Sequence, residues 1–128
     1  MRQAGKRQRA RSRKHAPKGR EKFMITFADF QKLSIRMGTI VEAEKVTGAD
    51  RLLKLIVDLG DEKRQVVAGI AMQYEAQQVI GKQVPVLCNL EPAKIRGVES
   101  NGMVLCAAMP EPRLLLPDQQ VPNGSKVK

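Results

Sequence analysis

The sequence predicts a mainly β fold, a five-stranded barrel with short helices, and two observations support this prediction. Apolar and polar residues alternate through several segments, as they do along strands with one buried face. Glycines and small polar residues separate these segments and predict tight turns. The apolar share of 42% is that of a globular domain. We therefore expect a barrel domain over residues 23–109, preceded by an arm over 1–22 and followed by a C-terminal extension over 110–128.

Charge sets residues 1–22 apart from the rest of the chain. They hold ten of the 23 Lys and Arg residues but only one of the 13 acidic residues, so they carry nearly all of the net charge of +10. A segment of this kind without apolar periodicity is expected to be a disordered basic arm. No apolar stretch reaches the ~18–20 residues of a membrane span, and no signal peptide is recognisable, so we expect a cytoplasmic protein.

A short helix is predicted at the start of the barrel domain. Thr26 and Asp29 have the hydroxyl-x-x-acid spacing of a capping box, with Asp in place of Glu or Gln. The apolar side of this helix would consist of Phe27, Phe30 and Leu33.

Three strands are predicted next. The first runs from 35 to 46, and Gly38 interrupts its pattern, which predicts a bulge or a coil that lets one long strand bend around a barrel. After a turn at 47–50, the second strand alternates with period two and should bury Leu53, Leu55, Val57 and Leu59. A hairpin turn at 60–63 leads into the third strand at 64–71.

A short helix and two further strands complete the prediction. The helix spans 74–80 and is ended by Gly81. The fourth strand spans 83–90, and one of its faces carries Val84, Val86, Cys88 and Leu90. Pro85 lies on the opposite face and suggests an edge position or a bulge. The fifth strand spans 102–109. Three strands, a helix and two strands follow one another as in an OB-fold, a small Greek-key barrel.

The residues needed for catalysis are sparse, so we expect a protein that is not an enzyme and uses no metal or cofactor. His15 is the only histidine and lies in the arm, which excludes a nucleophilic triad or a histidine metal site in the barrel. Asp61 and Glu62 are adjacent, but they are expected in a solvated turn. Cys88 and Cys106 lie in apolar runs and are expected to be buried reduced thiols.

A polar and basic loop between two apolar runs is the candidate binding site. It contains Asn89, Lys94, Arg96 and Ser100, which supply positive charge and hydrogen-bond donors suited to RNA phosphate. Arg36, Lys54 and Arg64 in the first three strands could extend this surface. Tyr74 is the only aromatic residue in the predicted barrel, so a base-stacking platform is nearly absent and we expect RNA to be read by backbone and shape.

The stretch 89–105 has the pattern N-L-x-P-x-K-x-x-G-x-x-S-x-G-M-x-L and resembles the tRNA-binding domain family. This family includes the C-terminal domain of methionyl-tRNA synthetase and its free-standing relatives. Further blocks at 30–38, 46–55 and 65–70 resemble the family as well, and Ser34 departs from it where Asp is common. The resemblance adds Met103 to the candidate contacts, and it covers roughly residues 27–128.

The resemblance implies an OB-fold that binds tRNA by its overall shape and assists a synthetase without catalysing a reaction. It also implies a homodimer built partly from the extension at 110–128. Two alternatives remain open. CsaA-type secretion chaperones of the same superfamily bind peptides, although their loops usually lack the complete run at 94–103. The domain could also act as a synthetase-assembly module, although such proteins carry a longer C-terminal domain.

Overall fold

The computed structural model describes residues 23–128, and the predicted arm at 1–22 lies outside the described residues. The chain divides between Lys32 and Leu33 into two units. In the first unit, helix α2 (Phe27–Gln31) begins at the predicted cap. The Thr26 hydroxyl accepts a hydrogen bond from the Asp29 amide at 3.0 Å, and the Asp29 carboxylate accepts one from the Thr26 amide at 3.1 Å.

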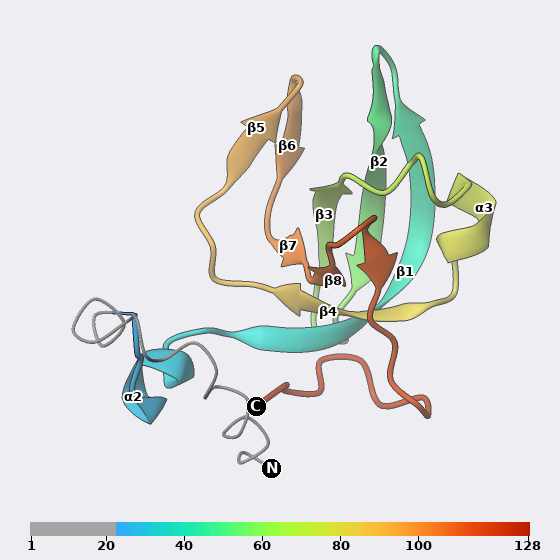
Figure 1. Ribbon diagram of the computed structural model, residues 1–128. Coiled ribbons are helices and arrows are strands. Elements are labelled where there is room, and N and C mark those ends of the chain that lie inside the picture. Colours follow the sequence, from blue (N-terminus) through green and yellow to red (C-terminus); the bar gives the residue numbers. More distant parts are fainter. Residues whose placement is uncertain (1–22) are drawn as a thin grey trace. The chain divides into compact units, whose positions relative to one another are not determined.

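The second unit, residues 33–128, is built on a five-stranded antiparallel sheet (Figure 1). The strands lie in the order β3-β2-β1-β4-β7. Their bounds are Ile35–Val46 for β1, Ala49–Asp58 for β2, Lys63–Ala68 for β3, Gln83–Leu87 for β4 and Met103–Val104 for β7. The outer strands β3 and β7 are in contact, so the sheet curls toward closure. The prediction of a mainly β, OB-like fold with short helices is confirmed.

The long first strand bends because it serves two neighbours. Its first half, 35–39, pairs with β4, and its second half, 39–46, pairs with β2. The register shifts between Ile40 and Glu42, so the bulge lies there and not at the predicted Gly38. Gly38 instead permits close packing, since a Cβ atom there would lie 2.5 Å from a methyl group of Val57 and 2.9 Å from the Asp58 carbonyl oxygen.

The core follows the predicted alternation of the second strand. All four apolar positions of that alternation are at most 1% exposed, namely Leu53, Leu55, Val57 and Leu59. They pack in one cluster with side chains from β1, β3, β4 and β7. This burial of one strand face against the opposite wall is the main source of stability in a small barrel.

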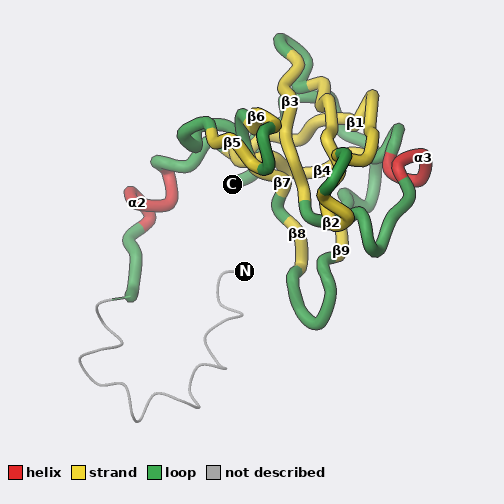
Figure 2. Tube along the Cα trace, turned by 90° about the horizontal axis from the view of Figure 1, so that it is seen from above, coloured by secondary structure: helices red, strands yellow, loops and turns green. Residues whose placement is uncertain are grey.

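The later elements are shorter than predicted. Helix α3 (Ala76–Val79) is a single turn between β3 and β4, and β4 ends before Leu90, whose side chain is 46% exposed. Pro85 does not mark an edge, because β4 lies between β1 and β7. The predicted fifth strand is divided into β7 and β8 (Cys106–Ala107), and β8 pairs with β9 (Arg113–Leu114). Figure 2 shows the loop of this β8–β9 hairpin projecting from the sheet.

The C-terminal extension returns to its own barrel along β1. The Met37 amide donates to the Ser125 carbonyl at 2.8 Å, and the Gly124 amide donates to the Met37 carbonyl at 2.7 Å. The Val127 amide donates to the Ile35 carbonyl at 2.8 Å. These hydrogen bonds use backbone groups in the first half of β1, the half that does not pair with β2. The extension therefore belongs to the barrel unit as much as the strands do.

Candidate nucleic-acid interface

A hairpin formed by β5 (Ala93–Ile95) and β6 (Val98–Ser100) projects from the sheet (Figure 1). Its two-residue turn is Arg96-Gly97, with φ values of +51° and +83°. Positive φ at both central positions is the conformation that favours a right-twisted two-residue hairpin. It costs Gly97 nothing but strains Arg96, because an L side chain rarely adopts it. A strained arginine thus occupies the tip of an exposed hairpin.

The base of the hairpin is fixed to β3 by several hydrogen bonds. The Arg64 guanidinium donates to the carbonyls of Cys88 and Asn101, which lie on either side of the hairpin. Gln65 donates from its side chain to the Glu99 carbonyl at 2.8 Å and accepts at its own carbonyl from the Asn101 amide at 2.8 Å. The hairpin is therefore held at its base while its tip makes no such bonds.

A second hairpin, β1–β2, faces the tip of β5–β6, and an open groove of about 640 Å³ lies between them. Its cationic side chains are Arg51, Lys94 and Arg96, and we call this site the basic groove. All three are exposed, and within residues 23–128 none has an ion-pair partner. Asp50 is the one acidic residue among the described residues that line it. Such a concentration of unpaired positive charge suits a polyanion.

The other predicted basic contacts are engaged in ion pairs. Arg36 lies 3.2 Å from the Asp61 carboxylate and 3.1 Å from that of Glu62, and Glu62 also pairs with Arg64 at 3.1 Å. Asp61 and Glu62 are thus not merely solvated. Lys54 pairs with a carboxylate on β1 at 2.9 Å. These ion pairs partly neutralise the positive charges of Arg36, Lys54 and Arg64. Contact of these three residues with RNA stays a prediction.

The polar members of the predicted site differ in accessibility. Ser100 is only 4% exposed, and its hydroxyl accepts from the Val67 amide at 2.9 Å and donates to the Gly102 carbonyl at 3.1 Å. Asn89 is exposed, and its side-chain oxygen accepts from the Ser34 amide at 2.8 Å. Both residues therefore help to fix the conformation of the loop. Contact of Asn89 and Ser100 with RNA stays a prediction.

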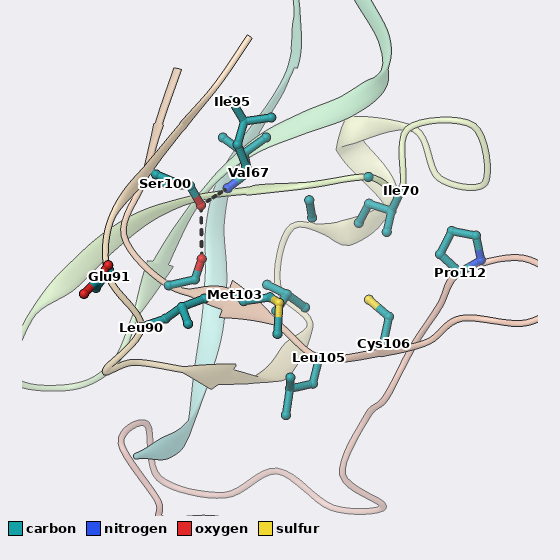
Figure 3. Close-up of a pocket in the computed structure, with 15 residues that line it drawn as sticks. Val67, Ile70, Leu90, Glu91, Ile95, Ser100, Met103, Leu105, Cys106 and Pro112 are labelled. Atoms are coloured by element: carbon teal, nitrogen blue, oxygen red, sulfur yellow. Dashed lines mark hydrogen bonds between the residues drawn. The ribbon is translucent and has the colours of Figure 1, made fainter. Parts of the chain in front are cut away.

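An apolar cavity of about 450 Å³ lies beneath the hairpin (Figure 3). We call it the apolar cavity. It is lined by the end of β3, the β5–β6 hairpin, β7 and the start of β8. Met103, which is 43% exposed, opens onto it instead of joining the cations of the basic groove. Burial raises the pKa of the Cys106 thiol in its wall, so this side chain stays neutral at physiological pH.

The predicted contacts Lys94 and Arg96 lie on one groove, and the structure adds Arg51, which was not among the predicted contacts. Arg51 follows the β1–β2 turn, more than forty positions before Arg96 in the chain, and only the fold places the two on one groove. Its exposed position at the start of a strand next to a turn was the available signal.

Within the described part of the chain, no group of three or more His, Cys, Asp or Glu side chains could hold a metal ion. The helices of the same residues include none with the length and apolar character of a membrane span.

Comparisons with known proteins find a matching family model, relatives of similar sequence and solved structures of similar fold. A family model described as "Putative tRNA binding domain" matches residues 35–126. The methionine–tRNA ligase of Methanothrix thermoacetophila is 51% identical over 112 residues, which are 87% of this chain and 17% of that protein. The chain thus spans about a sixth of the length of this curated relative.

Solved structures of similar size resemble the fold closely. A MetRS-related protein from Pyrococcus horikoshii superposes with a TM-score of 0.78 at 36% identity, covering 82% of this chain and 98% of that one. The chaperone CsaA from Bacillus anthracis superposes with a TM-score of 0.76 at 30% identity, covering 82% and 99%.

Proposed function

Because the chain belongs to the tRNA-binding domain family, we propose that its basic groove binds the phosphate backbone of folded tRNA. One observation carries this proposal. Three exposed cations from two separate hairpins, Arg51, Lys94 and Arg96, converge on one open groove without ion pairs among the described residues. A rigid barrel that presents cations at fixed separations can favour one arrangement of phosphates over another.

The surroundings of the groove favour recognition of shape over stacking. Tyr74 is the only aromatic residue in unit 33–128, and its hydroxyl accepts a hydrogen bond from the Leu114 amide at 3.2 Å. Its ring packs against the core cluster, and Tyr74 is not among the residues that line the groove. Without an aromatic platform, a flexible single strand gains little over a folded RNA of fixed shape.

We further propose that the domain supplies binding and not catalysis, and that it assists a methionine–tRNA ligase in cis or in trans. The matched segment is about a sixth of the ligase, which is enough for a tRNA-binding module beside a separate catalytic part. A tRNA partner also agrees with a cytoplasmic location.

A homodimer is the third part of the proposal. Leu115 and Leu116 remain 45% and 52% exposed, and Leu116 borders a shallow depression together with Gln83 and Pro117. A second copy of the chain could cover these side chains in a twofold, isologous interface.

One observation favours a second candidate, a chaperone. The apolar cavity could hold a side chain of an unfolded client, and the fold is shared with the chaperone CsaA. The two candidates differ in ligand charge, since the basic groove beside the cavity suits a polyanion better than a neutral peptide.

A binding titration separates the candidates. Folded tRNA, unstructured RNA of equal length and an unfolded apolar peptide are titrated against the full chain at one salt concentration. We expect the highest affinity for tRNA. Equal affinity for the two RNAs would remove the argument from shape, and preferential binding of the peptide would favour the chaperone.

A further inference from the structure

The apolar cavity and the basic groove adjoin each other, and the proposed backbone contacts use only the groove. Ile95 lines both of them. Lys94 and Arg96, on either side of Ile95 in the chain, line the groove, whereas Ala93 lines the cavity. The two hollows therefore meet at Ile95, and we call the pair the cleft, with the basic groove as its mouth and the apolar cavity as its floor.

The floor of this cleft is built from aliphatic and sulfur-containing side chains. Figure 3 shows Ile70, Leu90, Ile95, Met103, Leu105 and Cys106 around the cavity. The Ser100 hydroxyl cannot easily serve a ligand there, because both of its bonds are made inside the protein. Glu91 is the one charged side chain among the described lining residues. The volume of about 450 Å³ lies within the range of small-ligand sites, which runs from ~300 to ~1,000 Å³.

We propose that the apolar cavity receives one unstacked base of the RNA whose phosphates bind the basic groove. This inference rests on the proposed function. A nucleotide has the matching division, with its charge on the phosphate and a flat ring with apolar faces at the other end. Enzymes that extrude bases hold them between apolar side chains in the same manner.

A base fits the cleft better than the other occupants do. A regular duplex would offer only phosphates and sugars and would leave exposed Met103 and Leu90 in water. An apolar peptide would fill the floor but would leave three cations at the mouth without partners. The contact is apolar and has no dedicated hydrogen-bond donor from Ser100, so the base is retained chiefly through burial of its ring.

The test compares two RNA hairpins of identical charge. Each contains one bulged nucleotide, which carries adenine in the first hairpin and has no base in the second. Both are titrated against the full chain, so the arm at 1–22 acts equally on both. We expect loss of the base to lower the affinity about tenfold, which corresponds to about 1.4 kcal/mol. A fluorescent adenine analogue at the bulge should change its emission when the protein binds.

Two matched variants locate the effect. Ala93→Leu adds bulk inside the cavity and should remove the difference between the two hairpins. Ala107→Leu is the control, because Ala107 is exposed, does not line the cavity, and follows Cys106 on a strand whose side chains alternate. It should preserve the tenfold difference. The emission change in the wild-type chain supplies a second readout that does not depend on either variant folding.

Three results would overturn the inference. Equal affinity of the wild-type chain for the two hairpins would refute the base site and leave tRNA binding intact. Failure of both hairpins and of tRNA to bind would refute the base site and the proposed function together. Binding of an apolar peptide that Ala93→Leu abolishes, with equal affinity for the two hairpins, would assign the cavity to a peptide.

Discussion

At the scale of single residues, a positive side chain is useful for binding a phosphate mainly when no carboxylate of the protein already pairs with it. Arg36 and Arg64 lie among carboxylates at 3.1–3.2 Å, whereas Arg51, Lys94 and Arg96 have no ion pair within the described residues. An arginine already paired must give up that contact to bind a phosphate, so its net contribution is smaller. The left-handed backbone of Arg96 adds about 1–3 kcal/mol of local strain, a feature that clusters at functional sites.

The first prediction concerns the three cations of the basic groove. We expect tRNA binding to weaken by up to about 1.5–3 kcal/mol, the usual contribution of a charged hydrogen bond, in each of three single variants: Arg51→Ala, Lys94→Ala and Arg96→Asn. Asn tolerates the left-handed backbone, so Arg96→Asn should fold normally. Each loss should also reduce the slope of log K against log salt by about 0.7–0.9. Filter binding at several salt concentrations measures both quantities.

The control for these variants is Lys63→Ala. Lys63 is exposed and has no ion pair among residues 23–128, but it begins β3 at the end of the sheet away from the groove. It removes the same charge from a different place. Wild-type affinity in all three groove variants, or an equal loss in Lys63→Ala, would place the RNA elsewhere on the barrel.

The second prediction assigns Ser100 a structural role. Ser100→Ala removes the acceptor of the buried Val67 amide, and leaving a buried donor unsatisfied costs about 1–3 kcal/mol. We expect urea unfolding to show this loss of stability. Lys94→Ala, two strand positions from the hairpin tip, should show none. A Ser100→Ala protein with wild-type stability but weakened tRNA binding would instead identify a direct contact.

At the scale of elements, the third prediction concerns the attachment of the β5–β6 hairpin to β3. Arg64→Lys keeps the charge but loses the fork that reaches the carbonyls of Cys88 and Asn101. Hydrogen exchange of the hairpin amides should accelerate, and tRNA affinity should fall severalfold with an unchanged salt slope. Arg113→Lys, which alters a similar arginine–carboxylate pair in the β8–β9 hairpin, is the matched control. Weaker binding with unchanged exchange would mean that Arg64 contacts the RNA itself.

Sequence periodicity predicted those elements whose environment is local. The second strand alternates because its two faces differ, and the capping box of α2 depends on residues three apart. The bulge in β1 was predicted at Gly38 instead of between Ile40 and Glu42, and the division of the fifth strand was missed, because each depends on which strand lies alongside. The same limit applies to the site. Arg36 meets Asp61 and Glu62 across 25 or more positions of the chain, which no local pattern encodes.

At the scale of the whole molecule, charge is distributed very unevenly, and the fourth prediction concerns residues 1–22. Their ten cations can follow any phosphate backbone. Deleting them should lower affinity for all RNAs by similar factors, flatten the salt dependence and leave the preference for tRNA intact. Salt titrations of the full and truncated chains on tRNA and on unstructured RNA measure this. An unchanged slope would show that residues 1–22 do not contact RNA.

The last prediction concerns assembly, and the C-terminal extension makes it specific. The extension binds its own barrel through residues 124–127 along β1, and Leu114 packs against the core, so these parts need no partner. Leu115 and Leu116 remain about half exposed, and they are the part of the extension left for a second copy. Light scattering at micromolar concentration should report twice the mass of one chain.

A charge at the proposed interface should separate the two copies. Leu116→Glu places a carboxylate where an isologous contact would bury it twice, which an apolar interface tolerates poorly. This variant should therefore scatter as a monomer. Met109→Glu is the control, because Met109 is 86% exposed on the β8–β9 loop, outside the depression that Leu116 borders. A wild-type chain that scatters as a monomer would contradict the dimer. Dissociation by Met109→Glu but not by Leu116→Glu would place the interface at the β8–β9 hairpin instead.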